Sequence, residues 1–235
     1  MKIAIKIVAA CAILAGASGI FAQQIPAEPR NVVQLSANGS VEVQQDWLSL
    51  TLSSTKDGVD PSAVQAQLRQ ALDAAMAQAK PAVQAGAMDL RTGQFSLQPR
   101  YGRDGKITGW SGTTELVLEG RDFARIGSTA AKIQTLVIGN ASFGLSRELR
   151  AKVEGEAQDM AIAHFKARAT DIARGFGFAG YTLREVSVNS NDQGFVPRPR
   201  MMAMEMKASS ADAPVPLEAG KSSVVVSVSG SVQLK

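Results

Sequence analysis

Three glycines in the stretch RGFGFAG have the spacing G-x-G-x-x-G, the pattern of a loop that binds the pyrophosphate of a dinucleotide. In such a site the glycines follow a strand and open a helix, so that the pyrophosphate meets the helix N-terminus. Here Gly175, Gly177 and Gly180 follow a long predicted helix and precede a predicted strand. They lie at the negative end of the helix dipole, which repels phosphate. We therefore predict no dinucleotide site and expect Gly175 or Gly177 to end the helix in a left-handed conformation.

His164 is the only histidine, so a catalytic triad or dyad would have to include it. It lies within MAIAHFKARATDIARGF, which the apolar spacing predicts to be a helix. The buried face of this helix is expected to contain Ile162, Phe165, Ala169, Ile172 and Phe176. His164 falls about 100° from Phe165, at the flank of that face. The sequence has no Gly-x-Ser-x-Gly nucleophile elbow. We predict no catalytic residue and no enzyme activity.

Glu115 and Glu119 lie on one face of a predicted strand, and carboxylate pairs can perform acid–base catalysis. On a sheet such a pair is more often a pair of solvated charges. The spacing therefore assigns no role to either glutamate.

Met202, Met204 and Met206 alternate in MMAMEM, directly after Met201. Thioethers are soft ligands that could bind Cu(I), although no histidine or cysteine lies nearby to complete a tight site. The same side chains could instead form a mobile hydrophobic contact or an oxidisable patch. We retain these three methionines as candidate Cu(I) ligands and predict neither a resident metal nor a cofactor.

The first 22 residues have the layout of a signal peptide, with Lys2 and Lys6 before a short apolar run and then small residues. The run is shorter than the roughly 20 residues that a membrane-spanning helix needs. Cleavage could follow Ala17, Gly19 or Ala22, and Ala22 is favoured because a polar, Pro-containing segment starts there. We predict a periplasmic location. Cleavage removes Cys11, the only cysteine, and so excludes disulfides and a thiolate nucleophile.

A nucleic-acid partner is not expected either. Without Lys2 and Lys6, the chain keeps 23 of its 25 basic residues against 21 acidic ones. A charge this close to balance gives no basic surface for a phosphate backbone.

A polar leader at 23–31 precedes a single domain predicted at 32–235. The apolar positions change parity near Gln45 and Asp46, which predicts a bulge or a break in the extended chain there. Asp60 and Pro61 predict the start of a helix that extends to about Lys80. Its buried face is expected to contain Val64, Leu68, Leu72 and Met76. Five further strands are predicted, at 88–101, 106–120, 140–146, 181–190 and 222–234. Two further helices are predicted at 122–136 and 147–176. A flexible loop rich in Met and Pro is predicted at about 191–221. This order predicts an α+β fold of antiparallel sheets packed against two or three helices, including one long C-terminal helix.

Four stretches resemble the SIMPL-domain family, whose members include periplasmic immunogenic and oxidative-stress defence proteins of bacteria. The stretches are RTGQFSLQPRYGRDGKITGWSGTTELVLEGRDFARIG, NASFGLS, AIAHFKARATDIARGFGF and PLEAGKSSVVVSVSGSVQL. Gln45-Asp46 and Ala219-Gly220 stand where members often have Pro-Asp and Pro-Gly. The resemblance covers residues 32–235 and implies a SIMPL-like α+β fold, a tendency to form large ring-like oligomers, and no catalytic residues.

From these observations we expect a secreted, non-enzymatic periplasmic protein that self-assembles and supports the cell envelope, including in oxidative-stress defence. The expected partners are further copies of the chain and the envelope or outer membrane. The alternative is a binding module that uses the Met-rich segment 201–206 for a metal, a peptide or a lipid surface.

Overall fold

Strands and helices follow one another in the order that the sequence patterns predict. The computed structural model describes residues 30–191 and 218–235; the predicted signal peptide, most of the leader and the candidate ligands Met202, Met204 and Met206 lie outside the described residues. The elements are β1 (Val32–Gln44), β2 (Trp47–Gly58), α1 (Pro61–Ala79), a short 3-10 helix (Lys80–Ala82), β3 (Met88–Tyr101), β4 (Ile107–Gly120), α2 (Phe123–Lys132), β5 (Val137–Gly144), α3 (Arg147–Gly175), β6 (Tyr181–Asn191) and β7 (Lys221–Leu234).

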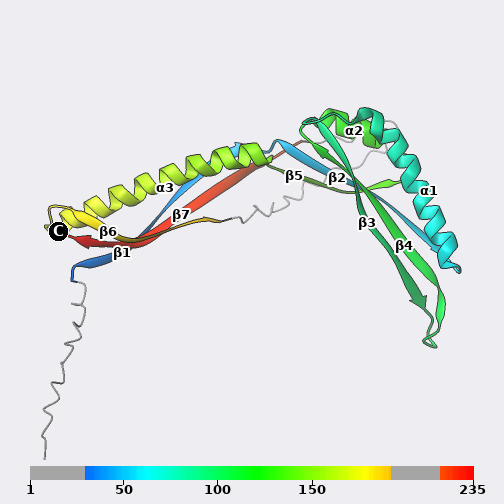
Figure 1. Ribbon diagram of the computed structural model, residues 1–235, viewed down its shortest axis with the longest axis horizontal. Coiled ribbons are helices and arrows are strands. Elements are labelled where there is room, and N and C mark those ends of the chain that lie inside the picture. The colour runs from blue at the N-terminus through cyan, green and yellow to red at the C-terminus, as the bar shows by residue number, and fades with distance from the viewer. Residues whose placement is uncertain (1–29, 192–217) are drawn as a thin grey trace, which may run out of the picture.

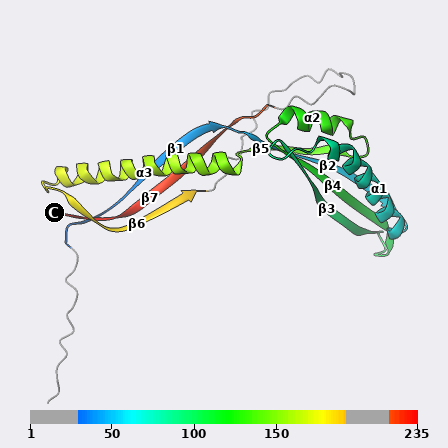
Figure 2. The ribbon, with the colours of Figure 1, turned by 45° about the horizontal axis from the view of Figure 1, so that its top comes forward.

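These elements form two lobes, each an antiparallel sheet with helices on one face. Lobe A contains a three-stranded sheet in the order β1-β7-β6, with α3 packed on it. Lobe B contains a four-stranded sheet in the order β3-β4-β2-β5, with α1 and α2 packed on it. Figure 1 shows the lobes end to end at an angle, with all three helices on the outer side of the bend, and Figure 2 shows the same arrangement turned forward. The predicted α+β class is confirmed.

The chain crosses from one lobe to the other at the predicted break. Gln45 and Asp46 lie between β1 and β2 and belong to neither strand. The Gln45 amide donates to the Gly220 carbonyl of the segment before β7, and the Asp46 amide donates to the Gly144 carbonyl of β5. The change of parity read from the sequence is therefore a change of sheet, because β1 buries odd-numbered positions under α3 and β2 buries even-numbered ones under α1 and α2.

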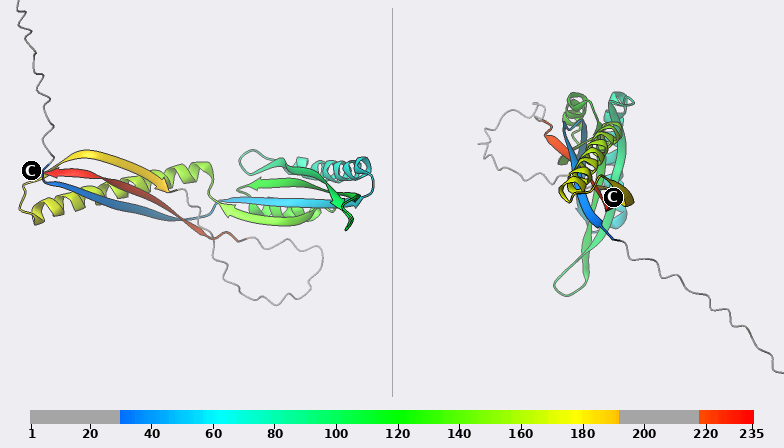
Figure 3. Two further views of the ribbon diagram at one scale, coloured as in Figure 1. Left: turned by 90° about the horizontal axis from the view of Figure 1, so that it is seen from below. Right: turned by 90° about the vertical axis from the view of Figure 1, so that its left-hand side faces the viewer.

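The first and last strands of the domain lie side by side. β1 and β7 pair along their whole length, from Val32 opposite Gln233 to Gln44 opposite Lys221. The Leu234 amide donates to the Asn31 carbonyl, which places the start of β1 beside the C-terminus at the outer end of lobe A (Figure 3).

Small residues allow α3 to approach its sheet closely. The fully buried residues of α3 are Val153, Ala157, Ala161, Phe165, Ala169 and Ala173. A Cβ atom on Gly39 of β1 would lie only 2.0 Å from the Ala157 carbonyl oxygen. The predicted buried face is therefore wrong in part: Phe165 and Ala169 are buried, Ile162 and Ile172 only partly, and Phe176 is 71% exposed. Large side chains cannot occupy the centre of a contact this close.

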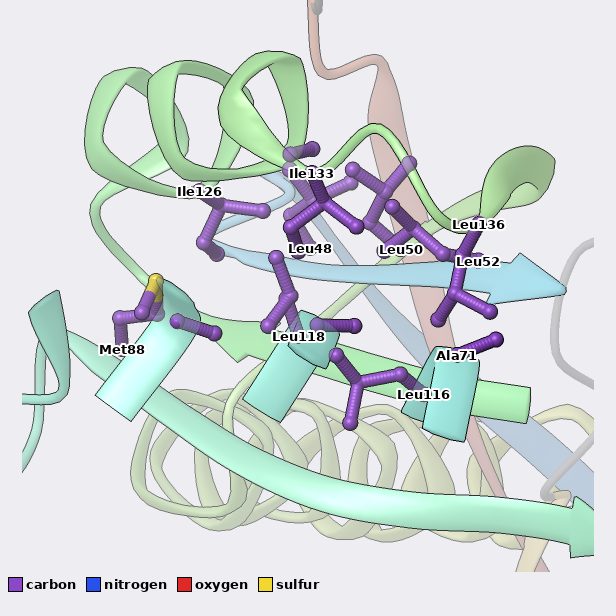
Figure 4. Close-up of a cluster of buried hydrophobic side chains, with 13 residues drawn as sticks. Leu48, Leu50, Leu52, Ala71, Met88, Leu116, Leu118, Ile126, Ile133 and Leu136 are labelled. Atoms are coloured by element: carbon purple, nitrogen blue, oxygen red, sulfur yellow. The ribbon is translucent and has the colours of Figure 1, made fainter. Parts of the chain in front are cut away.

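Lobe B has a leucine core built from β2, β4 and both of its helices. Figure 4 shows the side chains of β2 and β4 pointing toward those of α2 and the segment after it. The largest fully buried side chains here include Leu48, Leu50, Leu52, Leu116 and Leu118. On α1 the buried residues are Val64, Leu68, Ala71, Ala75 and Ala79. Leu72 and Met76, predicted on the buried face, are only partly buried, because alanines again occupy the closest contacts.

Two predicted boundaries in lobe B need correction. The helix predicted at 122–136 ends at Lys132, because Ile133 adopts extended backbone; Ile133 and Leu136 are nevertheless buried in the core. The strand predicted at 140–146 covers 137–144 instead, because its pairing with β2 begins at Val137 opposite Ser53.

Each main helix begins at a capping side chain. Asp60 accepts hydrogen bonds from the first turn of α1, with Pro61 in the first helical position as predicted. Ser146 caps α3. Asp122 accepts from the Arg125 amide and side chain of α2, and these bonds lower the pKa of the Asp122 carboxyl below its usual value. None of the helices among the described residues is long and apolar enough to span a membrane.

Candidate functional site

The glycine pattern forms a helix end and not a nucleotide site. Gly177 has a φ of 79°, in the left-handed region. The Phe178 amide donates to the Ala173 carbonyl over 2.9 Å, and the Gly177 amide donates to the Arg174 carbonyl over 3.0 Å. These two bonds make a Schellman motif, which satisfies the last carbonyls of α3. The prediction for Gly177 is confirmed, because this glycine ends α3 in the left-handed conformation.

His164 has a structural partner that the sequence did not predict. Its side chain is exposed, and Nδ1 lies 2.9 Å from the Asn38 carbonyl oxygen of β1. One turn later, Arg168 donates to the Ser36 carbonyl over 3.0 Å. Both carbonyls belong to an outer strand of the sheet, so the two side chains occupy the free edge of β1. No carboxylate or hydroxyl side chain hydrogen-bonds His164 in the described part of the chain.

The carboxylates Glu115 and Glu119 lie on the face of lobe B that the helices leave open, and each is held separately. Glu119 pairs with Arg91 over 3.2 Å. Glu115 accepts from the Gln94 backbone amide over 3.1 Å. Each carboxylate therefore has a donor of its own, and no printed contact joins the two glutamates to each other.

A polar network holds the junction between the lobes. Asp46 accepts from both the amide and the hydroxyl of Ser146, each over 2.6 Å. Arg121 lies 3.5 Å from Asp46 and also binds the Ser146 hydroxyl and the Glu148 carboxylate. The network joins the crossover between the sheets to the start of α3. Sequence reasoning missed it because Asp46 and Ser146 lie 100 residues apart; Ser146, a good cap residue before a predicted helix, was the only local signal.

A cavity of about 560 Å³ opens beside this junction. It is lined by Trp47, Asp89, Glu119 and the four residues Leu145–Glu148. Two of its charged side chains, Glu119 and Glu148, belong to the ion pairs already described, and the hollow has the size of a small-ligand site. Among the described residues no cluster of His, Cys, Asp and Glu has the arrangement needed to hold a metal ion.

A row of exposed apolar side chains lies on β6. Leu183, Val186 and Val188 are exposed to 53%, 44% and 43%, and we call them the β6 apolar row. They pair with Val232, Gly230 and Val228 of β7. The side chains of Val228 and Val232 pack in one cluster with α3, so the row lies on the helix-covered face of lobe A. Because α3 packs mainly on β1 and β7, it leaves the row uncovered. β6 is also an outer strand, with no described strand on its far side.

The sequence contained part of the signal for this surface. The alternation in YTLREVSVNS correctly predicts a strand, and the structure confirms it over Tyr181–Asn191. The sequence could not show that the row remains exposed, since that depends on where α3 crosses the sheet. It also gave no sign of the bulge between Leu183 and Glu185, which keeps Leu183 and Val186 on one face.

Comparison with known proteins gives one family and a small number of relatives. Residues 33–232 match the model of the family SIMPL, described as a protein of unknown function (DUF541). The "26 kDa periplasmic immunogenic protein" of Brucella melitensis biotype 1 is 29% identical over 156 residues, 63% of this chain and 62% of that protein. The protein of the same name from Brucella abortus (strain S19) matches equally. The chain thus matches less than two thirds of the length of either relative.

The similar solved structures include one of AtUAH in complex with glyoxylate. The two chains are 15% identical, and the match covers 56% of this chain and 34% of the AtUAH chain with a TM-score of 0.24. A second structure, with (S)-hydroxyglycine, has a TM-score of 0.25 at the same identity. At these scores the likeness supports no statement about activity.

Proposed function

Because the chain belongs to the SIMPL family, we propose that it is a non-enzymatic periplasmic protein that self-assembles and supports the cell envelope, including under oxidative stress. The printed names of its relatives support the periplasmic location, and the signal-like first 22 residues agree with it. Family membership carries no activity, since the family itself is described as of unknown function.

The β6 apolar row carries the self-assembly part of the proposal. Three neighbouring large apolar side chains, each about half exposed, lie on an outer strand beside a long helix. An exposed apolar row on an open sheet edge favours association with another chain. In the same lobe, His164 and Arg168 protect the opposite edge, so one edge is closed and the other is open.

The non-enzymatic part rests on how the polar groups are used. His164 binds a backbone carbonyl, and Glu115 and Glu119 bind separate donors. The junction network ties Asp46, Ser146 and Arg121 to one another across the lobe boundary. Each group that the sequence offered for catalysis within the described residues is thus engaged in holding the fold.

The cellular role can be tested in a strain that lacks the gene. The proposal predicts lower survival under peroxide and detergent stress, restored by the wild-type gene and by a His164→Ala variant. Wild-type survival of the deletion strain under both stresses would contradict the envelope role. Failure of His164→Ala to restore survival, when the variant is secreted at normal level and keeps the wild-type melting temperature and mass in solution, would contradict the non-enzymatic assignment.

A further inference from the structure

The uncovered edge of β6 has apolar and charged side chains that could match those of the same strand in a second copy of the chain. Next to the β6 apolar row the strand carries Arg184 and Glu185, one basic and one acidic residue in sequence. Both are exposed, and neither makes a hydrogen bond or ion pair with another side chain in the part of the chain that the structure describes. The opposite edge of the same sheet has its carbonyls occupied by His164 and Arg168.

The bulge determines which face each residue of β6 occupies. Tyr181 and Leu183 lie on the helix side before the bulge, and Val186 and Val188 lie on the same side after it. Thr182 and Ser187 lie on the other side, opposite Gln233 and Ser229 of β7. An antiparallel partner must match these faces, since a slip by one residue turns every side chain to the wrong side.

One antiparallel register of β6 with a second β6 matches every face. When the twofold axis passes between Arg184 and Glu185, Leu183 of one copy lies opposite Val186 of the other, and Tyr181 lies opposite Val188. Thr182 then lies opposite Ser187 on the far face. In the same register Arg184 lies opposite Glu185 of the other copy, twice over, so that opposite charges meet at the centre of the pairing.

We propose that two copies of the chain associate through antiparallel pairing of their β6 strands, centred between Arg184 and Glu185. The pairing joins the two three-stranded sheets into one six-stranded sheet with both α3 helices on the same side. It is an isologous contact, the commonest kind in homo-oligomers. This inference rests on the proposed self-assembly and specifies the surface that performs it.

The size of the contact sets how tight the pairing is. Residues 181–188 of each copy lie opposite one another, against the roughly 20–30 residues a side of a standard stable interface. The pair therefore dissociates on dilution unless further contacts of a larger assembly add to it. For this reason the test measures the dissociation constant across a concentration series.

The first experiment reverses the two central charges. Arg184→Glu and Glu185→Arg each place like charges opposite one another twice, and each is expected to raise the dissociation constant of the wild-type contact roughly tenfold. The double variant Arg184→Glu/Glu185→Arg restores both opposite-charge pairs and is expected to return to the wild-type value. Both residues are exposed, so circular dichroism and melting temperature should not change.

The second experiment fixes the register with cysteines. A Cys11→Ser background contains no other cysteine, and Thr182→Cys or Ser187→Cys is then added singly. In the proposed register residue 182 lies opposite residue 187 of the other copy, whereas within one strand they are about 16 Å apart, too far for a disulfide. Oxidation is expected to give covalent dimers in the mixture of the two variants and none in either variant alone.

The outcomes separate this inference from the proposed function. Restoration by the double charge reversal, with disulfides only in the mixture, supports the β6 pairing. An assembled protein that is insensitive to both charge reversals and gives no disulfide has its interface elsewhere, which overturns the pairing and leaves self-assembly standing. A chain that stays monomeric at every concentration overturns both.

Discussion

Replacing Gly39 by alanine should destabilise lobe A, because β1 and α3 touch through backbone atoms at this position. An ideal Cβ on residue 39 would lie 2.0 Å from the Ala157 carbonyl oxygen and 2.6 Å from the Ala161 amide nitrogen. Neither obstacle is a flexible side chain, so the helix itself must move away from the sheet. Overpacking in a core destabilises by about 1–3 kcal/mol, and contact with two backbone atoms indicates the upper end. The thermal unfolding midpoint should fall by roughly 6–12 °C.

The matched control lies on the same helix. Gly155 is exposed in α3, and a Cβ added there would meet nothing within 4 Å. Gly155→Ala should raise the stability by about 0.5–1 kcal/mol, since alanine favours the helical backbone. Both variants can be followed by circular dichroism during heating at one protein concentration. A Gly39→Ala variant as stable as the wild type would refute the close packing of α3 on β1.

Three further predictions follow from the described contacts. Val188→Lys places a charge in the β6 apolar row and should lower the mass in solution by weakening self-association. The control is Val59→Lys, at a valine that is 83% exposed between β2 and α1, and it should leave the mass in solution unchanged. Ser146→Ala should destabilise the protein by about 1 kcal/mol or more in urea unfolding, since it removes the cap of α3 and a partner of the Asp46 carboxylate; unchanged stability would contradict the junction network. Because the pKa of Asp122 is lowered in the folded state, its charge stabilises the fold above the usual carboxyl pKa of 3.8, and this stabilisation is lost as the pH falls through the folded-state pKa. The small difference in unfolding free energy between wild type and Asp122→Asn should therefore be present at neutral pH and vanish in acid. A difference that does not change with pH would contradict this role of Asp122.

The sequence predicted those features that are encoded locally. Asp60 and Pro61 fix the start of α1, and the left-handed Gly177 fixes the end of α3. The parity change at Gln45 and Asp46 marks the crossover between the sheets, although the pattern alone could not distinguish a bulge from a change of sheet. Such signals depend on a few neighbouring residues, so they can be read without knowing the tertiary structure.

The features that the sequence did not predict depend on contacts between distant segments. The buried stripe of α3 consists largely of alanines because Gly39, more than 100 residues earlier, brings the strand close to the helix. Apolar size was therefore a poor guide, as Phe176 shows by remaining exposed. The edge contacts of His164 and Arg168 and the uncovered β6 apolar row depend in the same way on where α3 crosses its sheet.

The mass of the protein in solution shows whether the chain assembles with further copies of itself. The measurement is light scattering coupled to size exclusion, over a concentration series, on wild-type protein purified from the periplasm. Pairing through β6 predicts a discrete mass that is an even multiple of the chain mass and that decreases on dilution. A single mass equal to one chain at every concentration would contradict it.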